Sequence, residues 1–477
     1  MKILNIESIY VGPWSILPPL VAIAVALISK EILSSLLIGM FTGTLIYSFF
    51  AHAGFMYSIE MIFDFMIDNL ASNASVIIFT SLLGSVSQIL IDSGGASGYT
   101  KWSEKKIKSS KFAQLSTILL SLVCSIDDTF LCLTVGNVMR PIMDKHKISR
   151  AKFAYIIDMM ASPLAVIMPI STWAAAIVAC MNNAGLPGMK IFMKSIVFNF
   201  YAIFSIIAAV LFAIVKKDFG QMKKFQDSAK NGNDVSCDPN FTQDIQKKEG
   251  KIWELILPIA VLIVGSIFML LETGGVFSGK SRNFASVMDN ANSDLSLNFG
   301  CLLSVLVSLL LFVPRKIKLT RFSDSAVEGI KSITPINVMI LLAWSMTSIY
   351  QNCLSTGDYI KNVIYYFNLS ETIIPFASFL ISTALSFAIG SSWATFGILI
   401  PIISTVVAGM SENIIVMSIA AILSGSIAGV NCSPVASMGM MASAGAGCKH
   451  LTHISSQVPY ALLVAIISAV SFLIFSY

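Results

Sequence analysis

Charged side chains are scarce in this chain. Asp, Glu, Lys and Arg make up 12% of its 477 residues, whereas a soluble globular protein carries about 25%. Hydrophobic residues make up 56%, and apolar runs long enough to span a bilayer recur along the whole length. This composition excludes a soluble domain and predicts an all-α polytopic membrane protein that is surrounded by membrane lipids.

Several kinds of functional motif are also missing. No Ser-His-Asp arrangement, zinc-binding spacing or nucleotide-binding loop is present, so the sequence predicts neither an enzyme nor a bound cofactor. The eight cysteines are scattered and lie mostly within apolar runs, which favours packing over disulfides or metal binding. The formal charge of +5 does not indicate nucleic acid, because the basic residues lie in loops between apolar runs. The first ten residues contain one basic residue, Lys2, and no apolar core, so we expect no cleaved signal peptide.

Two adjacent carboxylates, Asp127 and Asp128, lie inside one of the most apolar stretches of the chain, 125–173. A carboxylate at membrane depth costs several kcal/mol unless it faces protein or water. A helix cap within an apolar region is one explanation for this pair. We favour a second explanation, a binding site for a cation or a proton.

The segment 112–141 is apolar on both sides of this pair, and basic residues flank it at both ends. Basic loops prefer the cytoplasmic side of a membrane, so this segment must enter the bilayer and return. Each arm, about 13 residues long, reaches about 20 Å, which is past the midplane but not across. We therefore predict a re-entrant hairpin with its tip at 126–130.

Three further apolar segments are interrupted in the same way. The segment 151–184 contains Ser162-Pro163, 373–407 contains Gly390 to Trp393, and 414–446 contains Asn431 to Pro434. Proline removes a helix hydrogen bond and restricts the residue before it. We predict one broken helix at Ser162-Pro163, a second at 431–434, and a second re-entrant hairpin with its tip at 390–393.

The two halves of the chain follow one plan. The sequence Ser-Pro-Leu-Ala at 162–165 returns as Ser-Pro-Val-Ala at 433–436. Each half has five predicted spans and one hairpin, and an odd number of crossings inverts the second half. We predict a first inverted repeat at 1–215, a cytoplasmic linker at 216–251 and a second inverted repeat at 252–477. Most of the 31 Lys and Arg residues then fall on the linker side, as expected for a bacterial plasma membrane protein.

Four motifs at these interruptions carry a family resemblance. They are Asp-Asp-Thr-Phe-Leu-Cys-Leu-Thr-Val-Gly from 127, Pro-Ile-Ser-Thr-Trp from 169, Gly-Ser-Ser-Trp-Ala-Thr-Phe from 390, and Ser-Ala-Gly-Ala-Gly-Cys from 443, followed by His450 and His453. The chain closely resembles the NhaC-type Na⁺/H⁺ antiporter family over nearly its whole length. The resemblance implies an ion-transporter-superfamily fold, with inverted repeats, two re-entrant hairpins, two broken helices and a substrate site between them.

The chain also departs from the family pattern. Around the second-half Cys-Ser-Pro, the family commonly has two acids and a histidine, where this chain has Val430, Ser437 and Asn431. Leu131 replaces a polar residue that is usual before the first-half cysteine. The second half therefore offers hydroxyl, amide and carbonyl oxygens but no charge.

Oxygen-bearing side chains near the interruptions are the candidate ligands, because sodium is a hard cation that should prefer oxygen. Asp127 and Asp128 are the expected metal ligands, and Asp158 is a third source of negative charge. The other candidates for binding a cation or substrate are Thr129, Ser162, Ser171, Thr172, Ser391, Ser392, Thr395, Asn431 and Ser433. Helix packing is the alternative role for the serines, and an ion pair with a loop Lys or Arg is the alternative for Asp158.

The aromatic and imidazole side chains near the breaks have less specific interpretations. Trp173 and Trp393 are expected to pack, although an aromatic wall for an organic substrate is an alternative. His450 and His453 are expected to form a solvated or interfacial pair, because a metal site would need further ligands.

Two functions remain open at this point. In the first, Asp127 and Asp128 alternately bind Na⁺ and H⁺, and the two repeats expose them to either side of the membrane. In the second, helix N-termini at the breaks bind a small organic solute, such as an amino acid or carboxylate, whose transport is coupled to Na⁺ or H⁺. In either case Na⁺ is a transported or coupling ion, and the chain could form a homo-oligomer.

Overall fold

The computed structural model describes residues 8–29, 31–95, 98, 106–215, 217–238, 250–279, 287, 291–312, 318–356, 358–359, 362 and 370–476. Within these residues every regular element is a helix. In chain order they are η1 (Gly12–Ile16), α1 (Leu17–Ser29), α2 (Ile32–Phe50), α3 (Phe55–Ser72), α4 (Ala74–Ser93), α6 (Ser110–Val123), α7 (Asp128–Lys145), α8 (Arg150–Ile167), α9 (Thr172–Asn183), α10 (Gly188–Phe198), α11 (Phe200–Val215), α12 (Gly220–Lys230), α13 (Trp253–Thr273), α15 (Ser293–Phe312), α16 (Leu319–Asn352), η3 (Glu371–Ile373), α18 (Ile374–Ile389), α19 (Ser392–Val406), α20 (Glu412–Cys432), α21 (Ser437–Ala446) and α22 (His450–Phe475).

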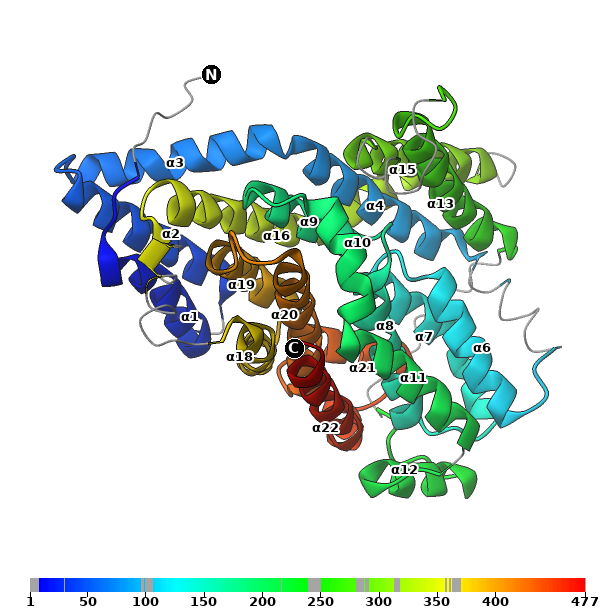
Figure 1. Ribbon diagram of the computed structural model, residues 1–477. Helices are drawn as coiled ribbons and strands as arrows, with labels where there is room; N and C mark the ends of the chain where they lie inside the picture. The colour runs from blue at the N-terminus through cyan, green and yellow to red at the C-terminus, as the bar shows by residue number, and fades with distance from the viewer. Residues whose placement is uncertain are drawn as a thin grey trace.

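The described helices confirm an all-α polytopic membrane protein. Eight of them are long and apolar enough to cross a bilayer, and the number rises to ten if each of two bent pairs is one span. Helix α20 is the most central of these spans. Of its apolar stretch 89% is buried, whereas the corresponding share is 39% for α13, α15 and α22. Figure 1 shows α18, α19 and α22 close to α20, with α13 and α15 at the far edge of the molecule. The inverted relation of the two halves stays a prediction.

Both predicted hairpin tips are breaks between two helices. Residues 124–127 separate α6 from α7, and residues 390–391 separate α18 from α19. Each second helix begins with a side-chain cap, since Asp127 accepts from the Phe130 N–H and Ser391 accepts from the Ala394 N–H. The positions of the interruptions are therefore confirmed, and the return of each hairpin to its side of entry stays a prediction.

The first broken helix is interrupted at a different place from the prediction. Ser162 and Pro163 both lie inside α8, and the break falls at 168–171, where α9 leaves α8 at 42°. Met168 precedes Pro169 and has an extended ψ of 120°, as the residue before a proline prefers. Ser171 then caps α9 by accepting from the Ala174 N–H. Pro169, which disfavours helix at Met168, and Ser171, which caps α9, lie close together here. Pro163 has no such capping residue after it and does not end α8.

The second broken helix is interrupted where the sequence predicts. Ser433 ends α20 with an extended ψ of 128° and precedes Pro434, and α21 begins at Ser437. The structural counterpart of Ser433-Pro434 is therefore Met168-Pro169. The repeated sequence at 162–165 and 433–436 occupies different positions in the two broken helices.

The described part of the predicted linker is an ordered element that contacts both halves. Helix α12 packs against α8 and α22, below α11 and α22 in the view of Figure 1. Gln226 accepts from the Ser149 N–H at 3.1 Å, and Ser236 Oγ accepts from the Ala151 N–H at 3.1 Å. The segment thus caps the start of α8. The boundaries of the three predicted regions remain untested.

Candidate functional site

The tip of the first hairpin holds two buried carboxylates beside the break between α8 and α9. Asp127 caps α7, with Oδ1 accepting from the Phe130 N–H at 2.8 Å and Oδ2 accepting from the Thr172 hydroxyl at 3.3 Å. The helix-cap explanation is therefore right for Asp127. Its second oxygen nevertheless points to another helix, so capping is only part of its environment.

Asp128 is surrounded by neutral donors. Its Oδ1 accepts from the Thr129 N–H at 3.0 Å, while Oδ2 accepts from Ser162 Oγ at 3.3 Å and from Trp173 Nε1 at 3.2 Å. The side chain is 2% exposed. No ion pair to Asp127 or Asp128 occurs within the described ranges. A buried carboxylate without a positively charged partner is unstable, so a bound proton or cation is needed to neutralise its charge.

The second hairpin has the same backbone arrangement without the charge. The Thr172 N–H donates to the Ile126 carbonyl at 3.2 Å, and the Ser437 N–H donates to the Gly390 carbonyl at 3.3 Å. In each half, the first residue of the second helix of the broken pair, α9 or α21, donates a backbone hydrogen bond to the predicted hairpin tip. Asp127 and Asp128 thus correspond to Ser391 and Ser392, so the fixed negative charge comes from the first half alone.

Most of the other predicted hydroxyl ligands bond to the backbone, either nearby in the chain or, for Ser392, on α20. Ser171 Oγ donates to the Ala165 carbonyl at 2.7 Å, Ser392 Oγ to Ser426 at 2.9 Å, and Thr395 Oγ1 to Ser391 at 2.9 Å. Ser433 Oγ accepts from the Val435 N–H at 3.3 Å. Ser162 and Thr172 are the predicted hydroxyl residues whose side chains reach the carboxylates, and Thr129 contributes its N–H.

Asp158 lies one helical turn before Ser162 on α8 and belongs to a second polar cluster, which it forms with α22. Its Oδ2 accepts from Gln457 Nε2 at 2.5 Å and lies 3.9 Å from His453 Nε2. The Gln457 amide also donates to the Asn431 carbonyl at 2.9 Å. Asn431 is therefore grouped with Asp158 and not with Asp128. Among the described residues, the hydrogen-bond and ion-pair partners of Asp158 come from α22 and include no Lys or Arg, so the alternative role of Asp158, an ion pair with a loop cation, is not found.

The placement of His453 also differs from the prediction. Its side chain is fully buried within α22, and it is neither solvated nor interfacial. His450 is partly exposed, and its Nε2 atom lies 2.8 Å from the Pro434 carbonyl oxygen. Gln457 was not among the predicted residues. The four-residue spacing of His453 and Gln457 in an otherwise apolar helix is the signal that could have identified both.

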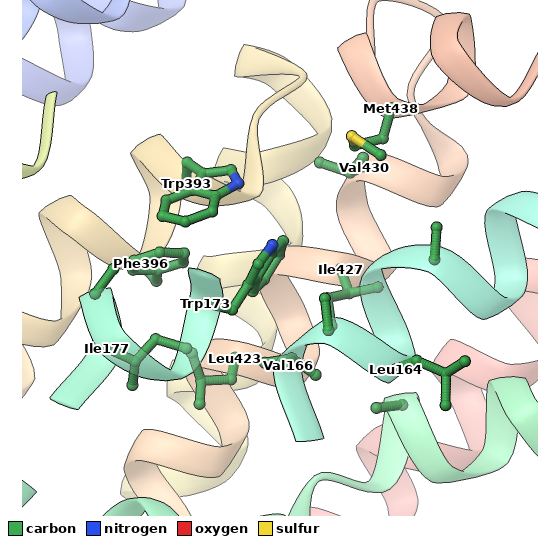
Figure 2. Close-up of a cluster of buried hydrophobic side chains, with 14 of the residues drawn as sticks. Leu164, Val166, Trp173, Ile177, Trp393, Phe396, Leu423, Ile427, Val430 and Met438 are labelled. Atoms are coloured by element: carbon green, nitrogen blue, oxygen red, sulfur yellow. The ribbon is translucent and has the colours of Figure 1, made fainter. Parts of the chain in front are cut away.

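An aromatic cluster fills the space between the two hairpin tips, as predicted for packing residues. The Trp173 and Trp393 rings lie 5.3 Å apart, and Phe396 lies 5.6 Å from Trp173. Figure 2 shows Trp173 in the middle of this cluster, with Trp393 and Phe396 on one side and Ile427 on the other. Because Trp173 also donates to Asp128, it joins the first-half carboxylates to the second half.

Two breaks between helices at the predicted hairpin tips, two broken helices and a pair of buried carboxylates beside them are the features of a secondary transporter. The chain belongs to the Na⁺/H⁺ antiporter family, whose model matches residues 153–477. It is 31% identical to an uncharacterized protein of Haemophilus influenzae, over 99% of this chain and 92% of that protein.

The chain is also similar to two solved structures. The YdaH transporter of Alcanivorax borkumensis superposes with a TM-score of 0.55, at 13% identity, over 88% of both chains. The antimetabolite efflux pump MtrF of Neisseria gonorrhoeae gives a TM-score of 0.45 at 14% identity, over 87% of this chain and 84% of that one. At this identity the likeness to YdaH concerns the fold alone.

Proposed function

We propose that this protein exchanges Na⁺ for H⁺ across a bacterial plasma membrane by alternating access, without covalent chemistry on its cargo. The observation that carries the proposal is the environment of Asp128, a buried carboxylate whose three hydrogen-bond donors in the described part of the chain are all neutral. A buried ion without a counter-ion is unstable, and either a proton or Na⁺ would neutralise it. Competition between the two at one carboxylate couples their movements.

The neighbouring carboxylate strengthens this coupling. Asp127 and Asp128 are adjacent and both buried, so the loss of both protons places two negative charges at the hairpin tip. Repulsion between like charges favours retention of one proton or entry of one cation. The Ser162 and Thr172 hydroxyls each approach one carboxylate at 3.3 Å, and together these groups form an oxygen set that suits a hard cation.

Alternating access is supported by the matching contacts of the two halves. The bonds from Thr172 to Ile126 and from Ser437 to Gly390 hold each hairpin tip to its own broken helix. Each pair could therefore move as a unit against the other across the aromatic cluster. Such rocking of repeats is the usual route by which secondary transporters expose a site to each side.

Transport of a small organic solute is the second candidate. It is favoured by the second hairpin, where Ser391 and Ser392 at the start of α19 leave a helix N-terminus with no acid beside it. A helix N-terminus attracts a carboxylate group. Under this function Asp127 and Asp128 would bind the coupling ion only.

Everted vesicles with a preset pH gradient, acid inside, distinguish the two functions. Na⁺/H⁺ exchange predicts that added NaCl or LiCl dissipates the gradient, and that Asp128→Asn abolishes the effect. Asp227→Asn is the matched control, because Asp227 is an exposed carboxylate on α12. A wild-type protein that leaves the gradient unchanged, yet takes up a labelled amino acid or carboxylate, would establish the second function instead.

A further inference from the structure

A second group of buried polar side chains, two of them titratable, lies on the boundary between the two halves. Asp158 comes from α8, His453 and Gln457 come from α22, and Asn431 comes from α20. All four side chains are fully buried. The Gln457 amide donates to both the Asp158 carboxylate and the Asn431 carbonyl, so a single side chain ties the first half to two helices of the second.

The orientation of Gln457 determines which atom faces His453. Since both donations use Nε2, the acceptor Oε1 is left for the imidazole, and it lies 2.9 Å from His453 Nε2. The Asp158 Oδ2 atom lies 3.9 Å from the same nitrogen. His453 Nε2 therefore has two acceptors in front of it, and it must carry a hydrogen to bond either one.

The other ring nitrogen also faces acceptors. His453 Nδ1 lies 3.3 Å from the Gly439 carbonyl and 2.9 Å from Ser443 Oγ. The Ser443 hydroxyl donates its own hydrogen to Gly439 at 2.6 Å, so its oxygen is free to accept from Nδ1. With the hydrogen on Nε2, Nδ1 can donate to these oxygens as part of an imidazolium or accept from the Ser443 hydroxyl as a neutral ring, so the site accommodates both protonation states of His453.

Within the described residues, Asp158 has an oxygen that lacks a donor, whereas His453 faces several acceptors. Its Oδ1 atom is buried and makes no hydrogen bond in the part of the chain that the structure describes. An unpaired carboxylate oxygen at this depth is costly unless it receives a proton or a counter-charge. The basic group that faces this carboxylate is His453, whose Nε2 atom lies 3.9 Å from Asp158 Oδ2.

We propose that Asp158 and His453 form a proton-binding pair that couples protonation to the contact between α8 and α22. With one proton the pair is neutral, as a carboxylate facing an imidazolium or as a carboxylic acid facing a neutral imidazole; a second proton makes it cationic, and loss of the first makes it anionic. The attraction between the two halves is greatest in the neutral, ion-paired state. This inference rests on the proposed exchange of Na⁺ for H⁺, and it supplies the titratable group that the second-half motif lacks.

Other titratable side chains surround this pair. Within the described residues, those that interact with Asp158 besides His453 are Cys132 on α7, Cys432 on α20, Tyr201 on α11 and His450 on α22. A thiol and a phenol stay neutral near pH 7. His450 is partly exposed, and its Nδ1 lies 3.4 Å from the Ser443 hydroxyl that also faces His453. Asp158 and His453 are the carboxylate and the imidazole of this cluster that are fully buried.

The test uses the purified full-length protein in proteoliposomes and compares two readouts. Counterflow of ²²Na⁺ reports Na⁺ binding and movement, and an internal pH dye reports Na⁺-driven proton flux. We expect His453→Gln to keep counterflow within twofold of the wild type. The same variant should lose at least tenfold in proton flux and should flatten its dependence on pH between 5.5 and 8.

A second variant tests whether a loss of proton flux is caused by misfolding. His453→Gln leaves Asp158 without its basic partner, so the double variant Asp158→Asn/His453→Gln, which buries no charge, is made in parallel. It should fold and keep counterflow, and proton flux should stay lost. Wild-type proton flux with an unchanged pH profile in either variant would overturn the inference.

The same assay separates this inference from the proposed function. Asp128→Asn should abolish counterflow as well as proton flux, because it removes the cation site itself. If the wild type shows no Na⁺ counterflow, the proposed function fails and this inference fails with it. If the wild type and the His453→Gln variant give identical proton fluxes, only this inference fails.

Discussion

The indole N–H of Trp173 donates to Asp128 Oδ2 at 3.2 Å, while the ring of the same residue packs 5.3 Å from Trp393. One side chain therefore touches both the buried carboxylate of the first half and the aromatic surface of the second. A change of charge at Asp128 alters the bond to Trp173, and the packing against Trp393 passes that change across the boundary.

Trp173→Phe removes the donor and keeps an aromatic ring in the cluster. Without this N–H, the charged form of Asp128 loses one of its three hydrogen bonds, so a proton competes better against Na⁺. A hydrogen bond to a charged group contributes about 1.5–3 kcal/mol, which corresponds to roughly a tenfold or greater change in affinity. We expect the Na⁺ concentration for half-maximal exchange to rise by about that factor in everted vesicles. Trp393→Phe is the control and should change it by less than twofold.

Asp127 has two roles that substitutions can separate. Asp127→Ser keeps a side chain that caps α7, just as Ser391 caps α19, but removes the charge. Asp127→Ala removes both and should lose about 1 kcal/mol of stability. In thermal unfolding of the detergent-solubilised protein, we expect the serine variant to match the wild type and the alanine variant to melt earlier. Both should bind Na⁺ weakly, and wild-type Na⁺ affinity in the serine variant would contradict a role for this charge.

The contact between α7 and α21 depends on two glycines. A Cβ on Gly445 would overlap the Cys132 carbonyl oxygen, and one on Gly136 would lie 2.5 Å from the backbone of Gly445. Overpacking of this kind costs about 1–3 kcal/mol, so we expect Gly445→Ala to lower thermal stability and transport together. Gly397→Ala is the control, since the nearest atom to its Cβ would be Ala343 Cβ at 3.4 Å. Equal stability of the two variants would show that the helices separate without cost.

Cys237 and Cys448 face each other in an isolated antiparallel bridge between the linker segment and the loop before α22. The flanking bonds, Asp238 N–H to Gly447 and Lys449 N–H to Ser236, are both 3.1 Å, which makes the cysteines a non-hydrogen-bonded pair. Such pairs have Cα atoms about 4.5 Å apart, within the range that a disulfide spans. We expect the oxidant diamide to join the two thiols with a loss of two hydrogens in the intact mass.

The rate of this cross-link should depend on pH in a defined direction. Burial raises the pKa of Cys448, and burial also raises the pKa of Cys237, with the Asp234 carboxylate adding to both effects. Because the thiolate is the attacking species, the rate should increase steadily from pH 7 to pH 9. Cys237→Ser removes the product. If diamide leaves the wild-type mass unchanged at pH 9, the two side chains do not face each other in solution.

Local rules explain why the interruptions could be located from the sequence. At Gly390-Ser391 and at Ser433-Pro434, a helix stop and a helix start lie within a few residues of each other, and both breaks are found there. The same rules applied to Ser162-Pro163 gave a wrong position. That proline has no start signal after it, whereas Pro169 is followed by Ser171, which caps α9. A proline inside a packed helix costs one hydrogen bond and can be tolerated.

The sequence by itself determined that this protein spans a membrane, where three of the four predicted interruptions lie, and that the acidic residues at those breaks belong to the first half. Each of these depends on composition or on neighbouring residues, because bilayer insertion and helix capping are local. Only the tertiary structure decided that Asp158 meets His453 and Gln457, nearly three hundred residues away, and that Trp173 lies between Asp128 and Trp393. Such contacts depend on how helices pack, and the packing of α8 against α20 and α22 is not encoded in any short stretch of the chain.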